Sequence, residues 1–165
     1  MYYKEEILEE LSRINKMLKE YNYNLDLKIV CGAALLFNGI RSIETTDVDT
    51  INKVSQQIKE ILNDYSLDIN DDALDYIENY QDCNFIYNDK QFSNISIEYL
   101  LIGGVIKTKL KNCQDDYKME KLAYLLEEEL GVELTLDGIS TYLKSIDVEP
   151  NEYDITEFLK AYEKC

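Results

Sequence analysis

Two aspartates separated by one residue, Asp47 and Asp49, are the side chains whose type and spacing most directly suggest chemistry. They fall in residues 46–51, which have the pattern of a β-strand, and alternate residues of a strand project from one face. Two ionised carboxylates so close together repel each other unless a divalent cation lies between them. The pair therefore predicts a site for Mg²⁺ or Mn²⁺, which binds carboxylates together with substrate phosphates. In a chain with 33 acidic residues, a solvated turn is the alternative.

A glycine-containing turn precedes this pair by fifteen residues and predicts a phosphate-binding loop. Residues 25–31 alternate like a strand, Gly32 ends that strand, and a short helix is expected from Ala33 to Asn38. Helix N-termini offer unpaired N–H groups, and glycine lets a phosphate approach the backbone closely. The turn would hold a triphosphate while the aspartates hold its metal.

The run KIVCGAALLFNGIRSIETTDVDT, over residues 28–50, carries a family resemblance. It resembles the nucleotidyltransferase superfamily, which has the DNA-polymerase-β-like fold. It is most similar to a small bacterial branch near the abortive-infection toxin nucleotidyltransferases, whose pattern is Gly-Gly-x-Ala, then Arg, then Thr-x-Asp-Ile-Asp. The positions that match this pattern are Gly32, Ala34, Arg41, Thr45, Asp47, Val48 and Asp49.

The resemblance implies transfer of a nucleoside monophosphate from a nucleoside triphosphate to an acceptor, with Mg²⁺ or Mn²⁺ held by Asp47 and Asp49. Lys107 and the acids Asp115 and Asp116 loosely resemble a downstream lysine and an acidic helix start that are found in the toxin branch. Lys107 could also be an ordinary surface residue, and Asp116 a helix N-cap or first-turn acid. The residues implied to contact the nucleotide are Gly32, Ala33, Arg41, Thr46 and Lys107.

Two departures from the family pattern bear on activity. The phosphate loop has Ala33 where the family has a second glycine or a serine. The third metal-binding carboxylate is not obvious, and Glu98 is the candidate, on a strand predicted over residues 92–99. An exposed glutamate is the alternative reading of that position.

Composition narrows the chemistry further. The chain has 17 basic and 33 acidic residues, a net charge of −16, which argues against general binding of nucleic acid. It has no histidine, so Ser-His and Cys-His dyads are excluded, and its four cysteines lack the spacing of a zinc site. Any catalysis must therefore use carboxylates, lysine, backbone dipoles or a metal.

The predicted fold class is α/β (α+β), with a small mixed β-sheet flanked by helices and followed by a helical C-terminal part. Residues 1–100 would form the nucleotidyltransferase-like core, and residues 101–165 the helical part packed on it as one compact unit. About three strands are expected. Helices are also predicted over residues 4–21 and 53–64. A further short helix would be capped by Asp71 or Asp72 and carry Leu74 and Ile77. In the C-terminal part, apolar stripes predict helices over residues 122–130, 136–146 and 158–162.

Three functions remain open at this level. The first is a metal-dependent nucleotidyltransferase of a toxin or phage-defence system, whose acceptor could be transfer RNA, a protein or a small molecule. The second is a degenerate relative that binds nucleotide or a protein partner, including a second copy of itself. The third is an acidic, antitoxin-like inhibitor. No signal peptide or apolar stretch of about 20 residues is evident, so we expect a cytoplasmic protein without a membrane partner.

Overall fold

The computed structural model describes residues 2–41, 43–73, 84–87, 92–112 and 115–163. The chain divides into two compact units, Met1–Ile102 and Gly103–Cys165. Each unit is described by itself below.

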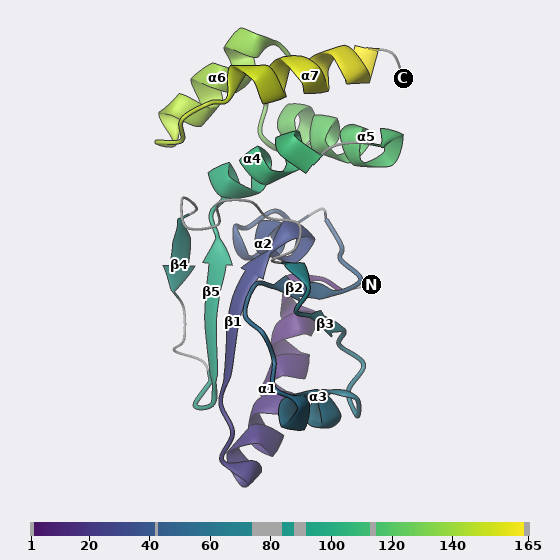
Figure 1. The fold of residues 1–165 in the computed structure, drawn as a ribbon, viewed down its shortest axis with the longest axis vertical. Coiled ribbons are helices and arrows are strands. Elements are labelled where there is room, and N and C mark those ends of the chain that lie inside the picture. Colours follow the sequence, from purple (N-terminus) through teal and green to yellow (C-terminus); the bar gives the residue numbers. More distant parts are fainter. Residues whose placement is uncertain (1, 42, 74–83, 88–91, 113–114, 164–165) are drawn as a thin grey trace. The chain divides into compact units, whose positions relative to one another are not determined.

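The first unit is built on a five-stranded mixed sheet with the strand order β3-β2-β1-β5-β4 (Figure 1). The central strand β1 runs antiparallel to β2 and parallel to β5, while β3 is parallel to β2 and β4 antiparallel to β5. The predicted fold class is confirmed. The strands are β1 (Leu25–Val30), β2 (Val48–Thr50), β3 (Ile69–Asn70), β4 (Phe85–Tyr87) and β5 (Ile95–Leu100).

The predicted number of strands was too low, because β3 and β4 are short edge strands. They have two and three residues, which is too few to show the alternation that identifies a strand in a sequence. The predicted strand over residues 92–99 is β5, which begins three residues later than expected.

Among the described residues of this unit, three helices accompany the sheet: α1 (Lys4–Tyr21), α2 (Cys31–Phe37) and α3 (Gln56–Leu62). Helix α1 confirms the prediction for residues 4–21 and lies behind the sheet in Figure 1. Helix α3 starts three residues later than predicted, because the Ser55 side chain accepts a hydrogen bond from the N–H of Ile58 and caps the helix. The α1 stripe that forms the centre of the core is Ile7, Leu11, Ile14 and Leu18.

The two faces of the sheet differ in polarity. On β1, Leu25, Leu27 and Ile29 are at most 2% exposed, whereas Asp26 is exposed and Lys28 half-buried. Tyr99, which pairs with Ile29 on the apolar face, has its ring centre 5.6 Å from that of Phe37 of α2, and the two rings are tilted relative to each other. One face is therefore covered by hydrophobic packing, and the other carries the polar side chains of the strands.

The second unit is helical, as predicted for the C-terminal part. Gly103 packs so closely on the segment around Val148 that an added Cβ would collide with the Val148 side chain. Across the described parts of the chain, no helix has the length and apolar character required to cross a membrane. The elements are α4 (Ile102–Asn112), α5 (Asp116–Tyr124), the π-helical turn η3 (Leu125–Glu129), α6 (Leu136–Ser145) and α7 (Glu152–Glu163).

Candidate functional site

The turn between β1 and α2 is sharper than the sequence indicates. Val30 is extended, and Cys31 has a φ of 59°, in the left-handed region that side chains other than glycine adopt at a cost. Helix α2 begins at Cys31, not at Ala33 as predicted. The strained residue is thus Cys31, the one before Gly32. The sequence Cys-Gly does not indicate that the cysteine adopts the left-handed conformation.

Thr45 joins this turn to the segment that carries Asp47. A Cβ added to Gly32 would lie 3.3 Å from the Thr45 hydroxyl oxygen, so the two residues are in contact. That hydroxyl, which is in a residue only 8% exposed, donates a 2.9 Å hydrogen bond to the carbonyl of Asp47. The structure therefore brings the predicted glycine turn and the predicted aspartate segment together.

Residues near the N-terminus also form hydrogen bonds with this segment. Tyr2 and Thr45 exchange two backbone hydrogen bonds of 2.7 and 3.0 Å, and the Tyr2 hydroxyl donates to the carbonyl of Ser66 at 2.7 Å. The Tyr3 hydroxyl donates to Glu44. Sequence reasoning missed this attachment, because residues 2 and 45 are distant in the chain and neither lies in a strand long enough to show a pattern.

Only one of the two predicted metal ligands lies within a strand. Asp49 is in β2 opposite Val30, but Asp47 lies in the bend that precedes β2. The predicted strand over residues 46–51 is shorter because the hydrogen bond from Thr45 to the Asp47 carbonyl bends the chain there. Both aspartates are half-buried, whereas Val48 between them is fully buried in the core.

Asp47 is in an environment that disfavours its charge. Burial raises the pKa of its carboxyl, and the negative charge of Asp68 raises it further. Asp68 comes near because the N–H of Val48 donates to its carbonyl at 2.8 Å, where β2 meets β3. Within the described residues, the Asp47 carboxylate has no hydrogen-bond or ion-pair partner. An external cation would relieve this unfavourable charge.

Asp68 was missed by sequence reasoning. It is exposed and immediately precedes the two-residue strand β3, so only the pairing of β3 with β2 reveals its neighbour. An acidic residue in a chain this acidic gives no separate signal.

Glu98 lies on β5 and forms an ion pair with Lys28 of β1 at 3.6 Å. Because Glu98 pairs with Lys28 and Asp49 with Val30, two residues further along β1, both acids project from the polar face. In the regions that the structure describes, no three Asp, Glu, Cys or His side chains are close enough to hold a metal ion together. Glu98 is thus not clustered with Asp47 and Asp49, and its catalytic role stays a prediction.

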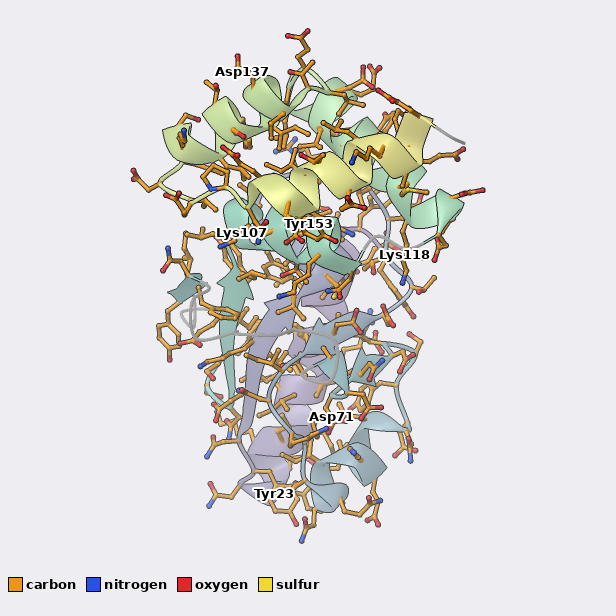
Figure 2. The ribbon with its side chains drawn as sticks, turned by 45° about the horizontal axis from the view of Figure 1, so that its top comes forward. Tyr23, Asp71, Lys107, Lys118, Asp137 and Tyr153 are labelled. Carbon is orange, nitrogen blue, oxygen red and sulfur yellow. The ribbon has the colours of Figure 1, made fainter. Side chains whose placement is uncertain are left out.

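The remaining predicted contacts are exposed. Arg41 precedes the bend and Thr46 lies in it, and Lys107 is an exposed residue of α4 in the second unit (Figure 2). Their contact with a nucleotide stays a prediction. Asp115 is the N-cap of α5 and accepts a 2.8 Å hydrogen bond from the N–H of Lys118, and Asp116 is a first-turn acid, as one of the alternatives proposed.

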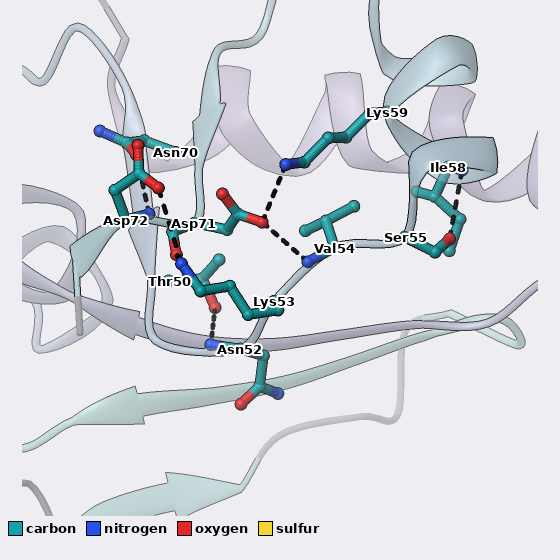
Figure 3. Close-up of polar contacts among 10 residues, drawn as sticks. All are labelled: Thr50, Asn52, Lys53, Val54, Ser55, Ile58, Lys59, Asn70, Asp71 and Asp72. Atoms are coloured by element: carbon teal, nitrogen blue, oxygen red, sulfur yellow. Dashed lines mark hydrogen bonds and ion pairs between the residues drawn. The ribbon is translucent and has the colours of Figure 1, made fainter. Parts of the chain in front are cut away.

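A second acidic site follows β3 and is drawn in Figure 3. The Asp71 carboxylate accepts a 2.9 Å hydrogen bond from the N–H of Val54 and lies 3.2 Å from the ammonium of Lys59. These contacts, the backbone hydrogen bond first, lower the pKa of Asp71. Asp71 therefore fastens the β2–α3 connection; the predicted helix that it would cap, with Leu74 and Ile77, lies outside the described residues.

An open groove of ≈530 Å³ lies beside this site along the segment from α3 to the end of β3. Asp68 and Asp71 both line it, together with Lys59 and Tyr65. Asp68, whose charge acts on Asp47, is therefore part of the lining of this groove.

The donor set at the bend suits a divalent cation. Mg²⁺ is usually held by one or two carboxylates, with phosphates and water completing its octahedral shell. Asp47 and Asp49 supply two such carboxylates, and Asp68 adds negative potential at Asp47. The two carboxylates are therefore the residues that would hold such an ion.

A glycine turn joined by a threonine to an aspartate bend, on a small mixed sheet, is the arrangement expected of a nucleotidyltransferase. A family model described as "Nucleotidyltransferase of unknown function (DUF6036)" matches residues 6–164. The chain belongs to this family, which confirms the predicted superfamily, while the abortive-infection branch stays a prediction. No curated protein and no solved structure matches the chain.

Proposed function

We propose that this protein is a metal-dependent nucleotidyltransferase that moves a nucleoside monophosphate from a nucleoside triphosphate to an acceptor. The observation that carries the proposal is Asp47: a half-buried carboxylate, next to Asp68, whose charge the described part of the chain does not neutralise. Its contact through Thr45 with the glycine turn supports a site where a metal and a triphosphate bind together.

In this proposal Asp47 and Asp49 hold Mg²⁺ or Mn²⁺, which neutralises developing charge and lowers the proton affinity of the acceptor. The N–H groups of Gly32 and Ala33 contact the phosphates. Helix α2 has only seven residues, so these individual N–H groups matter more than a helix dipole. Positioning and charge neutralisation suffice for phosphoryl chemistry, so the absence of histidine is no obstacle.

The net charge of the chain indicates only the class of the acceptor. A net charge of −16 disfavours a long RNA, so a protein or a small molecule is the preferred acceptor class over transfer RNA. Arg41, Thr46 and Lys107 are the proposed additional contacts to the nucleotide. A role in a toxin or phage-defence system is part of the same proposal, as is a cytoplasmic location.

A degenerate protein that binds nucleotide without transferring it is the second candidate. It is favoured by the lack of a three-carboxylate cluster among the residues described, since two-metal transfer needs ligands for both ions. Replacement of a family glycine or serine by Ala33 points the same way.

Thermal unfolding with Mg²⁺ or Mn²⁺ and each of the four nucleoside triphosphates tests nucleotide binding. A ligand at about 100 times its Kd stabilises the native state by about 2.7 kcal/mol, which raises the Tm by roughly 5–10 °C. The Asp47→Asn/Asp49→Asn variant should lose this rise. Glu9→Gln/Glu20→Gln, two exposed positions on α1, removes the same charge and should keep it.

Pyrophosphate release then separates the two candidates. A transferase releases pyrophosphate when a suitable acceptor from a fractionated cell extract is added, and a degenerate protein does not. A wild-type protein whose Tm is unchanged by every combination of metal and nucleotide would contradict both.

A further inference from the structure

Lys28 occupies the middle of the polar sheet face and is held there by two contacts. Its ammonium lies 3.6 Å from the Glu98 carboxylate and 5.6 Å from the centre of the Phe85 ring. Its side chain is 37% exposed and that of Glu98 30%, so the pair is partly withdrawn from water. A cation–π contact and an ion pair together fix a side chain that is otherwise among the most flexible.

The strand register fixes which acids Lys28 can serve. Glu98 is its direct partner on β5, whereas Asp49 faces Val30, two residues further along β1 on the same face. Asp26, the other acid of this face on β1, accepts a hydrogen bond from the Ser96 hydroxyl at 2.5 Å. Lys28 is therefore the cation beside Glu98 on the sheet face that also carries Asp49.

We propose that Lys28 is a built-in counter-cation for Glu98. A divalent metal at the Asp47/Asp49 site must displace this lysine from Glu98. The inference rests on the proposed function, because it takes Glu98 as a carboxylate that the metal recruits. An ammonium and a divalent ion repel each other, so both cannot be close to one carboxylate without weakening each other's binding. Lys28 thus positions Glu98 apart from the aspartates until the metal arrives.

This role is consistent with the strand order, in which β1 lies between the strands of Glu98 and Asp49. Glu98 and Asp49 share a face, yet no three-carboxylate cluster exists among the described residues. Three carboxylates close together repel strongly without a metal. Pairing Glu98 with Lys28 avoids that repulsion in the metal-free protein.

Binding of Mn²⁺ without nucleotide, followed by electron paramagnetic resonance of the free ion, tests the proposal on the full chain. Lys28→Met removes the competing charge and should tighten Mn²⁺ binding roughly twofold to fivefold, the range expected for a partly exposed pair. In Lys28→Met/Glu98→Gln the gain should vanish, because the recruited carboxylate is absent. Lys28→Arg, which keeps the charge, should bind Mn²⁺ as the wild type does.

A matched control separates this effect from the general loss of a positive charge. Lys16 is an exposed residue of α1, the helix behind the sheet, and Lys16→Met should leave Mn²⁺ affinity unchanged. Circular dichroism of each variant establishes that it is folded.

The possible results divide clearly. The proposal is overturned if Lys28→Met binds Mn²⁺ no more tightly than the wild type, or if the gain persists in the double variant. If the wild type still shows its nucleotide-dependent rise in Tm, only this inference fails. If neither the wild type nor Lys28→Met responds to Mn²⁺ or nucleotide, the proposed function fails with it.

Discussion

Asp47 and Asp71 lie at the ends of neighbouring strands, and the protein treats their charges in opposite ways. Asp71, just after β3, receives a backbone N–H and the ammonium of Lys59, and its pKa is lowered. Asp47, just before β2, is half-buried beside Asp68, and its pKa is raised. One carboxylate is neutralised by its own chain, and the other is suited to a cation from outside.

The difference separates a structural acid from one that we propose to be functional. Carboxylates whose charge is unfavourable in the folded state are concentrated at functional sites. Asp71 holds the β2–α3 connection and needs no ligand. The contrast leads to substitutions of the same chemistry whose effects on stability have opposite signs.

Asp71→Asn should produce the largest change, a loss of about 1–2 kcal/mol in the free energy of unfolding. The substitution keeps the shape but replaces a charge-assisted hydrogen bond from Val54 with a neutral one and removes the ion pair to Lys59. Urea unfolding followed by circular dichroism measures it. Asp72→Asn is the matched control, since Asp72 pairs with Lys53 at the surface and should contribute under about 0.5 kcal/mol.

The pH dependence identifies the cause of that loss. Because the folded pKa of Asp71 is lowered, its ionised form adds stability above the unfolded pKa of about 3.9, and this is lost as pH falls through the folded value. The difference between wild type and Asp71→Asn should therefore shrink as the pH falls below about 4. A difference that stays constant with pH would mean that the substitution acts through packing.

Asp47→Asn should have the opposite effect and stabilise the metal-free protein by about 0.5–1 kcal/mol at pH 7. The raised pKa means that ionised Asp47 weakens the folded state at neutral pH, and asparagine removes that charge. The gain should shrink as pH falls through the raised folded pKa and vanish below the unfolded pKa of about 3.9, where the aspartate is protonated in both states. The same urea experiment measures it.

A double-mutant cycle with Asp68 tests whether repulsion contributes to this gain. Asp68→Asn should also stabilise the protein, and the two substitutions together should give less than the sum of their separate effects. Fully additive gains would mean that Asp47 is affected by burial alone. Destabilisation by Asp47→Asn would remove the contrast with Asp71.

Sequence patterns were sufficient where the signal is local and repeated. The stripe of α1 and the alternation of β1 gave the helix, the strand and the apolar face, and the turn and aspartate motifs gave the family. What they could not show depends on contacts between distant segments. The proximity of Asp68 to Asp47 requires the pairing of β3 with β2, and that of Lys28 to Glu98 requires a parallel register between residues 70 apart.

Backbone strain was equally invisible in the sequence, and it provides the smallest predicted effect. Cys31 is left-handed with a φ of 59°, so the Asp47 site again contains an unfavourable feature that the Asp71 site lacks. Cys31→Gly should stabilise the protein by about 0.5 kcal/mol, because relief of the strained side chain exceeds the entropy that glycine loses on folding. Cys31→Ala keeps the Cβ and should give no such gain. If alanine stabilises the protein as much as glycine does, the thiol and not the backbone is the source of the strain. The turn would then be as relaxed as the Asp71 loop.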